Sequence, residues 1–294
     1  MLKWKVPVSI ITGYLGVGKT TLLKKIISDT KKKIAILMNE FGEIGIDTKI
    51  MKGKNVDMME LLGGCVCCSL TGELTAAIEE ILKKVKPDMI VIETTGVAEP
   101  DAMIANIDDV EGVRLDSVIT IVDADAFVNF PRLGHTGRVQ IENADVIILN
   151  KVDLVHTSQI DEIEHALQEL NPRAPIIKAT YSNLDTRVLF GLETERAVAE
   201  HGTHDATIID SFVYRSDRIH ERSRFLKFAS DIPKEVYRAK GFVNFSDGTY
   251  LFNFVNGRYD MSKSDKQDTE IVFIGVDIDR LEQETIESLR SCQA

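Results

Sequence analysis

Mostly apolar runs and helical apolar spacings alternate along the first part of the chain. The runs predict buried strands at 6–11, 34–38, 89–92, 118–123, 145–149 and 175–180. Apolar residues at helical spacing predict helices between them, at 21–27, 74–82 and 160–170. Strands that alternate with helices are typical of a mainly parallel sheet, so we expect an α/β fold with helices on both faces of the sheet.

The pattern changes after about residue 205. Short strands are predicted at 212–214, 242–245, 251–254 and 271–276, and an Asp-Gly pair at 247–248 indicates a hairpin turn. An acidic helix is predicted from about residue 279. We therefore expect an α/β domain at 1–185, a linker at 186–206 and a smaller C-terminal α+β domain at 207–294.

The stretch between the first strand and the first helix carries the clearest chemistry. Residues 13–20 read GYLGVGKT, which fits the phosphate-binding loop G-x-x-x-x-G-K-[ST]. Its glycines let backbone N–H groups turn toward phosphate oxygens, and the positive end of the following helix adds to the attraction. Lys19 is expected to reach the β- and γ-phosphates, and the Thr20 hydroxyl to bind Mg²⁺. The expected nucleotide contacts here are Gly13, Gly16, Val17, Gly18, Lys19, Thr20 and Thr21. The fold class is accordingly that of a P-loop NTPase.

Acidic residues follow two of the predicted strands. Glu93 ends an apolar strand and precedes Thr-Thr-Gly, which is the Walker B arrangement, so we expect it to hold Mg²⁺ and Gly96 to approach the γ-phosphate through its N–H. Residues 39–47 hold three carboxylates and two glycines directly after a strand. This segment is either a switch loop, with Glu40 and Glu43 as candidate catalytic groups, or a solvated connection.

A guanine-recognition motif follows a later strand. Residues 150–153 read NKVD, in which the Asp153 carboxylate is expected to accept from guanine N1–H and N2–H₂. Asn150 and Lys151 belong to the same motif. The end of the strand at 175–180, which includes Ala179, is expected to meet the base. These residues predict a preference for GTP.

Three cysteines lie close together after two glycines. Cys65, Cys67 and Cys68 are soft thiolate ligands that suit Zn²⁺, Cu(I) or an Fe–S cluster. Neighbouring sulfurs on one short loop do not easily close a tetrahedral shell, so water, the 39–47 segment, a second chain in a homodimer, or a client would supply the rest. An incomplete shell suits metal transfer better than a structural role. The other interpretation is a set of buried, inert cysteines.

Composition narrows the classes of partner. A net charge of −11 argues against non-specific nucleic-acid binding, which needs a cationic face. The chain has no apolar run long enough to span a membrane, and its N-terminus enters a predicted strand at once, which leaves no room for a signal peptide. We therefore expect a cytoplasmic protein with neither a nucleic-acid nor a membrane partner. In a reducing compartment, clustered cysteines favour metal binding or catalysis over disulfides.

Taken together, these motifs resemble the CobW-type GTPases, which are related to the urease and hydrogenase accessory GTPases. The RAKGF stretch at 238–242 resembles the signature of that family's C-terminal domain. The resemblance implies zinc or cobalt at Cys65, Cys67 and Cys68, slow GTP hydrolysis, and delivery of the metal to a client metalloprotein. It also implies that residues 39–47 couple nucleotide to metal. The chain lacks the histidine-rich run of many members and has six histidines in all, so metal storage by histidine is not expected.

Two alternatives from other classes stay open. One is a thiolate-ligated Fe–S carrier. The other is a P-loop enzyme, a kinase or ligase, that acts on a small metabolite in cobalamin metabolism. The second alternative requires phosphoryl-acceptor residues that the sequence does not identify.

Overall fold

The computed structural model describes residues 5–30, 32–38, 56–60, 71–96, 98, 100–129, 133–186, 189, 209–255, 257–264, 268–276 and 278–294. The chain divides into two compact units, over Lys3–Thr186 and Arg187–Ala294. The predicted linker at 186–206 lies almost wholly outside the described residues. In the part of the chain that the structure describes, no helix is long and apolar enough to cross a membrane.

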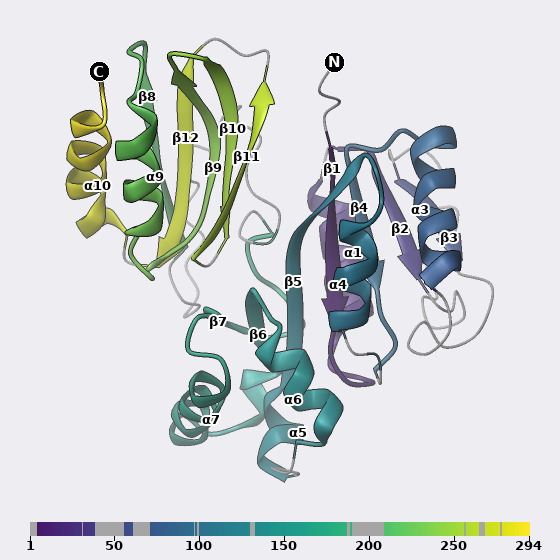
Figure 1. The fold of residues 1–294 in the computed structure, drawn as a ribbon. Coiled ribbons are helices and arrows are strands. Elements are labelled where there is room, and N and C mark those ends of the chain that lie inside the picture. Colours follow the sequence, from purple (N-terminus) through teal and green to yellow (C-terminus); the bar gives the residue numbers. More distant parts are fainter. Residues whose placement is uncertain are drawn as a thin grey trace. The chain divides into compact units, whose positions relative to one another are not determined.

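The first unit is built on a seven-stranded sheet of the described residues, in which all neighbouring strands are parallel (Figure 1). Its strands are β1 (Val6–Thr12), β2 (Ile34–Met38), β3 (Val56–Glu60), β4 (Met89–Glu93), β5 (Val113–Asp123), β6 (Val146–Asn150) and β7 (Ile176–Ala179), in the order β3-β2-β4-β1-β5-β6-β7. The parallel α/β fold predicted from the sequence is confirmed. Strand β3, which is short and carries two acidic residues, was missed.

The helices of this unit follow the strands in turn. They are α1 (Lys19–Asp29), α3 (Thr71–Lys84), α4 (Pro100–Asp108), α5 (Ala124–Asn129), α6 (His135–Glu142) and α7 (Thr157–Leu170), with a short 3₁₀ turn, η2, at Val152–Leu154. Helix α1 leads from β1 toward the β3 edge of the sheet, whereas α3, α4, α6 and α7 lead toward the β7 edge. Because such crossovers are right-handed, α1 covers one face of the sheet and the other four helices cover the opposite face. Figure 1 shows α4 and α6 on the near side of the sheet.

This change of direction positions the functional site. Strand β1 lies between β4 and β5, and its helix covers the face opposite to theirs. In open α/β sheets, ligands bind beyond the carboxyl ends of the strands at such a switch point. The core on the α3–α4 side is apolar and includes Val8, Ile10, Ile90 and Ile92, which are fully buried. The loops that follow β1 and β4 are thus carried by a rigid, closely packed centre.

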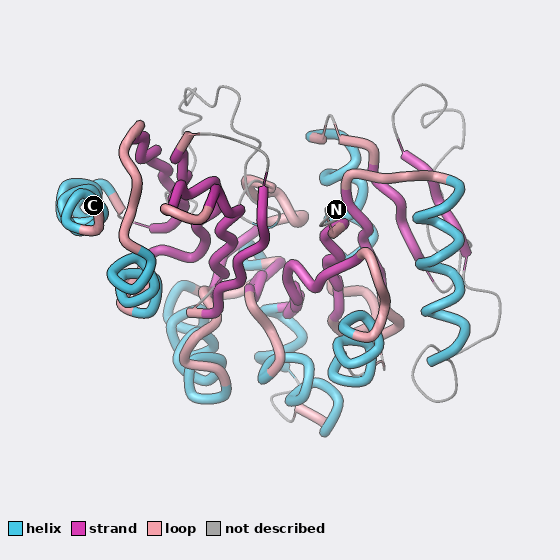
Figure 2. Tube along the Cα trace, turned by 45° about the horizontal axis from the view of Figure 1, so that its top comes forward, coloured by secondary structure: helices cyan, strands magenta, loops and turns pink. Residues whose placement is uncertain are grey.

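The second unit is a five-stranded antiparallel sheet with two helices. Its strands are β8 (Ile209–Ser216), β9 (Val236–Phe245), β10 (Gly248–Val255), β11 (Arg258–Ser264) and β12 (Thr269–Val276), in the order β11-β10-β9-β12-β8. Helices α9 (Arg222–Ser230) and α10 (Asp279–Ser291) bury Phe225 and Leu289 in one cluster with Phe252 and Phe273 of the sheet. Figure 2 shows the strands in magenta and these two helices in cyan. The α+β expectation is confirmed, although α9 and β11 were not predicted.

The RAKGF stretch lies in β9, where two of its residues have structural roles. A Cβ at Gly241 would overlap the carbonyl oxygen of Glu270 on β12, so only glycine fits there. The Arg238 guanidinium is fully buried and donates to the carbonyl of Leu189 (3.1 Å) and to Asn253 Oδ1 (3.4 Å). A buried cation of this kind needs several acceptors, and the fold supplies them.

Candidate nucleotide-binding site

The phosphate loop joins β1 to α1, and its glycines have the conformation that only glycine adopts easily. The φ angles of Gly13, Gly16 and Gly18 are 134°, 76° and 113°. A Cβ at Gly13 would overlap the carbonyl oxygen of Ile121, and one at Gly18 would lie 2.5 Å from Asn150 Nδ2. The spacing of the motif is therefore a requirement of the backbone path.

Lys19 begins α1 and is buried. Its ammonium donates to the carbonyl oxygens of Gly13 (2.8 Å) and Tyr14 (3.0 Å), which belong to the loop itself. These bonds hold a positive charge against the curve of the loop. The arrangement suits a phosphate, which would replace carbonyl acceptors with stronger anionic ones.

Thr20 and Glu93 come from different elements and meet at the carboxyl edge of the sheet. The Thr20 hydroxyl donates to Glu93 Oε1 at 3.4 Å, and Glu93 is 7% exposed at the end of β4. Hydroxyl and carboxylate oxygens are the hard ligands that Mg²⁺ prefers, so this pair fits a magnesium ion. Both residues were predicted for this role from the sequence.

Asn150 ends β6 and connects three segments. Its side-chain amide donates to the carbonyl of Val17 (2.8 Å), and its Oδ1 accepts from the backbone N–H of Ser182 (2.8 Å). The Ser182 hydroxyl in turn donates to the carbonyl of Gly18 (3.2 Å). Asn150 is 2% exposed, so the structure places its side chain between the phosphate loop and the segment after β7.

The other residues of the guanine motif lie beside it. Lys151 has a left-handed backbone (φ 62°), and its ammonium lies 2.6 Å from Asp123 Oδ2 at the end of β5. Asp153 lies in η2 with an exposed side chain, as a base-reading carboxylate requires. Ala179 is buried at the end of β7, in register with Asn150. The motif residues are thus gathered at one end of the sheet, and direct contact with a base stays a prediction.

Three residues of this region were missed by sequence reasoning. Tyr181 and Ser182 have φ angles of 53° and 52°, an uncommon conformation for residues other than glycine. Tyr181 is 79% exposed. Nothing in their sequence marks this conformation. The third residue, Asp123, does carry a signal, because it ends an apolar strand as Glu93 does.

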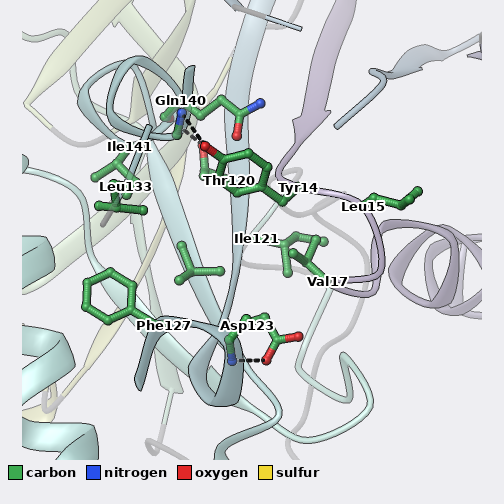
Figure 3. Close-up of a pocket in the computed structure, with 13 residues that line it drawn as sticks. Tyr14, Leu15, Val17, Thr120, Ile121, Asp123, Phe127, Leu133, Gln140 and Ile141 are labelled. Carbon is green, nitrogen blue, oxygen red and sulfur yellow. Dashed lines mark hydrogen bonds between the residues drawn. The ribbon is translucent and has the colours of Figure 1, made fainter. Parts of the chain in front are cut away.

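A cavity of about 230 Å³ lies beside the phosphate loop, between β5, α5 and α6 (Figure 3). Its walls include Tyr14, Val17, Phe127, Leu133 and Ile141. The Tyr14 ring points from the loop toward α6, where its hydroxyl accepts from the backbone N–H of Gly137 at 3.2 Å. The phosphate loop is therefore attached to α6 as well as to the sheet.

The predicted metal ligands cannot be placed. Cys65, Cys67, Cys68, Glu40 and Glu43 lie outside the described residues. In the described part of the chain, no group of three or more His, Cys, Asp or Glu side chains could hold a metal ion.

The strands that lead into these segments are described. Met38 at the end of β2 is in register with both Glu60 at the end of β3 and Glu93 at the end of β4. Strands β2 and β3 therefore end at the same edge of the sheet as Glu93.

Cys292 is the cysteine within the described residues. It is buried, and its thiol donates to the carbonyl of Ser288. Burial raises the pKa of the Cys292 thiol, which disfavours the reactive thiolate.

Comparison with known proteins matches both units. Residues 7–178 match the model of the CobW/HypB/UreG nucleotide-binding domain, and residues 209–293 match that of the cobalamin synthesis protein CobW C-terminal domain. The chain is 30% identical to the zinc chaperone CobW of a Sinorhizobium species, over 92% of this chain and 93% of that protein.

Two further matches extend the comparison. The chain is 36% identical to zinc-regulated GTPase metalloprotein activator 1 of Schizosaccharomyces pombe, over 61% of this chain, and it spans about half of that protein's length (47%). Among solved structures, a Zn(II)-bound triple mutant of the YjiA GTPase shares the fold, with a TM-score of 0.51 and 24% identity over 99% of each chain.

Proposed function

This chain belongs to the CobW family of P-loop GTPases, and on that premise we propose that it is a metallochaperone, which binds a transition metal at its cysteine loop and delivers it to a client metalloprotein. Zinc is the metal that we favour, because the relatives described above are named for zinc. Cobalt is the second choice. We place this activity in the cytoplasm, where a reducing environment keeps neighbouring thiols from pairing.

The observation that carries the proposal is the register of the strand ends. Met38, Glu60 and Glu93 end neighbouring strands in register, and β1, which leads into the phosphate loop, is the next strand along. The cysteine segment follows β3, and the acidic 39–47 segment follows β2. Both segments therefore start on the edge of the sheet where phosphate and magnesium would bind.

Hydrolysis of GTP would use the groups at the switch point. Lys19 and the N–H groups of the phosphate loop would neutralise the phosphates, while Thr20 and Glu93 would hold Mg²⁺. The bound Mg²⁺ would supply positive charge to the phosphate oxygens. Gly96 would donate its N–H to the γ-phosphate, and Glu40 or Glu43 would position the attacking water. None of the motifs around the phosphates contains an arginine, so intrinsic turnover should be slow.

Specificity for guanine would come from the exposed carboxylate of Asp153, at the end of the sheet where Asn150 fixes the phosphate loop. A carboxylate that accepts from two donors of guanine rejects adenine, which lacks that pair of donors. Tyr181, which is exposed in the neighbouring loop, would lie beside the base.

Metal binding would be coupled to the state of the nucleotide. The thiolates of Cys65, Cys67 and Cys68 would provide three soft ligands, and the fourth would come from Glu40, Glu43 or a second copy of the chain. GTP would order the 39–47 segment, as the γ-phosphate does in other GTPases, and so tighten the metal shell. Hydrolysis would relax the segment and leave the metal exchangeable, which gives delivery a direction.

The test is a zinc titration against a colorimetric chelator, with GDP and with a non-hydrolysable GTP analogue. We expect zinc to bind about 5- to 150-fold more tightly with the analogue, the usual range of coupling between two sites. Cys67→Ser should remove the difference, and Cys292→Ser, the matched control at a buried cysteine, should preserve it. Equal zinc affinities of the GDP-bound and the analogue-bound protein would refute the proposed coupling of metal binding to the nucleotide. A brown, iron-containing protein after anaerobic purification would instead favour the Fe–S carrier.

A further inference from the structure

Helix α6 contacts both the phosphate loop and the turn that follows β4. Gly137 donates its backbone N–H to the Tyr14 hydroxyl of the phosphate loop. One turn later, the Gln140 side-chain amide donates to the carbonyl oxygens of Ala98 (2.9 Å) and Gly96 (3.3 Å). Residues three apart share a helix face, so one face of α6 makes both contacts.

The turn after β4 is itself packed against the phosphate loop. A Cβ at Gly96 would lie 2.6 Å from the backbone nitrogen of Leu15, so the two backbones are in direct contact. A Cβ at Gly137 would lie 2.7 Å from the ring of Tyr14. The loop, the turn and α6 therefore form a closed ring of contacts, in which Gly96 lies against backbone and Gly137 lies against the Tyr14 ring.

Gln140 is the polar centre of this ring. It is 1% exposed, and its backbone carbonyl accepts from the Thr120 hydroxyl at 2.7 Å. Apolar side chains are the usual occupants of fully buried positions, so core packing alone does not call for an amide here. A buried amide needs acceptors, and the two carbonyls of the turn are the acceptors that it has.

We propose that Gln140 is a positioning residue for GTP hydrolysis, which holds the turn at Gly96 and Ala98 against the phosphate loop so that the Gly96 N–H faces the γ-phosphate. The inference rests on the proposed function, in which Gly96 contacts that phosphate. GDP lacks the γ-phosphate. Removal of the Gln140 amide should therefore weaken binding of GTP more than binding of GDP, and it should slow turnover.

The test variant is Gln140→Met, which keeps the length of the side chain and removes its donor. Dissociation constants for GDP and for a non-hydrolysable GTP analogue, together with kcat, are measured by nucleotide titration and phosphate release. We expect analogue affinity and kcat to fall about tenfold, as the loss of a buried neutral hydrogen bond predicts, with GDP affinity changed by less than about twofold.

The matched control is Asn171→Leu, which removes another amide that bonds the C-terminal end of α6 but does not contact the turn after β4. Asn171 is also a buried amide, and it donates to the carbonyl oxygens of Ile141 (2.8 Å) and Ala144 (2.9 Å). This variant should lower thermal stability without changing the ratio of analogue to GDP affinity. If Asn171→Leu changed the ratio of analogue to GDP affinity as much as Gln140→Met does, the proposal would be overturned. Loosening of α6 by any means would then explain the effect, without a role for the Gln140 amide.

A second variant covers the case in which Gln140→Met does not fold. In Gln140→Glu, an ionised carboxylate would face two carbonyl oxygens, and protonation would restore one donor. Its kcat relative to the wild type should rise as the pH falls below 7, and a flat ratio would overturn the inference. If the wild type hydrolyses GTP but the variants lose analogue affinity and GDP affinity equally, this inference alone is overturned. Absence of hydrolysis by the wild type would overturn the proposed function and this inference with it.

Discussion

Replacement of Asn150 by alanine should destabilise the first unit and weaken nucleotide binding, whichever base the nucleotide carries. The Asn150 amide makes two hydrogen bonds of 2.8 Å, to the carbonyl of Val17 and from the N–H of Ser182. Both Asn150 and Ser182 are buried, so water cannot easily replace the lost partner. The phosphate loop and the segment after β7 would lose the connection through Asn150, while the bond from the Ser182 hydroxyl to the Gly18 carbonyl would remain.

The magnitude follows from these contacts. Loss of two neutral hydrogen bonds costs about 1 kcal/mol each, and a buried N–H left without an acceptor adds about 1–3 kcal/mol, for a total of roughly 3–5 kcal/mol. In a unit of this size each kcal/mol lowers Tm by about 2–4 °C, so the expected fall in Tm is roughly 6–20 °C.

The assay compares Asn150→Ala with Asp153→Ala, which removes an exposed carboxylate three residues away. Urea unfolding and thermal melting should show a large loss for Asn150→Ala and almost none for Asp153→Ala. Competition between GTP and ATP should show the reverse, with Asp153→Ala losing roughly 2–4 kcal/mol of GTP binding, the scale of a charge-assisted pair of hydrogen bonds. If Asn150→Ala melts like the wild type and loses only GTP affinity, the stabilising role assigned to the bonds of Asn150 with Val17 and Ser182 is refuted.

Three further outcomes are expected. Lys19→Ala and Thr20→Ala should each abolish measurable GTP hydrolysis in a phosphate-release assay, while retained turnover in either would contradict its role at the phosphates or at Mg²⁺. Burial lowers the pKa of His220 from its usual value of 6.5, which favours the neutral ring in the folded state. The stabilisation of the second unit by this residue should therefore be complete above about pH 6.5 and should fall as the pH drops below that value. Urea unfolding midpoints measured between about pH 7.5 and 5.5 would show the change. A His220→Gln variant should lose that dependence, whereas His165→Gln, at an exposed histidine, should keep it. Gly241→Ala should destabilise the second unit by more than about 2 kcal/mol, because the methyl group overlaps the carbonyl of the neighbouring strand, and an unchanged melting curve would show that β12 can move away.

The phosphate loop and the meeting of Thr20 with Glu93 could be expected from the sequence because their determinants are local. The loop between β1 and α1 is set by glycines at fixed spacing, and each φ that requires glycine has one. Glu93 was recognisable because an acidic residue ends an apolar strand, and parallel strands bring their ends to one edge. No long-range information was needed for either.

Helices α4, α5 and α6 were not predicted. Three further missed elements, β3, β11 and α9, have few hydrophobic positions from which to predict them. Strands β3 and β11 both lie at the edge of their sheets, where few residues of a strand need to be buried. Helix α9 buries only Phe225 and Ala229 among its described residues. A periodicity argument depends on the number of buried positions, so elements at the periphery escape it.

The contacts of Asn150 and Gln140 were beyond the sequence for a different reason. Asn150 was assigned to the nucleotide by its motif, while its partner Ser182 is 32 residues away. Gln140 reaches Ala98 across 42 residues. Neither residue lies in a local pattern that names its partner, because only the packing of the sheet and helices brings them together.

The strand order sets a length scale for communication within the first unit. Adjacent strands are about 4.8 Å apart, so the end of β3 and the end of β1 are separated by three spacings, or roughly 14 Å. That span exceeds the Debye length of about 8 Å at physiological ionic strength, so a solvent-exposed charge at one of these strand ends is largely screened at the other. Coupling between the phosphate loop and the segment after β3 therefore depends on the parts of the chain that lie between them, which are the ends of β4 and β2 and, in the proposed function, the 39–47 segment.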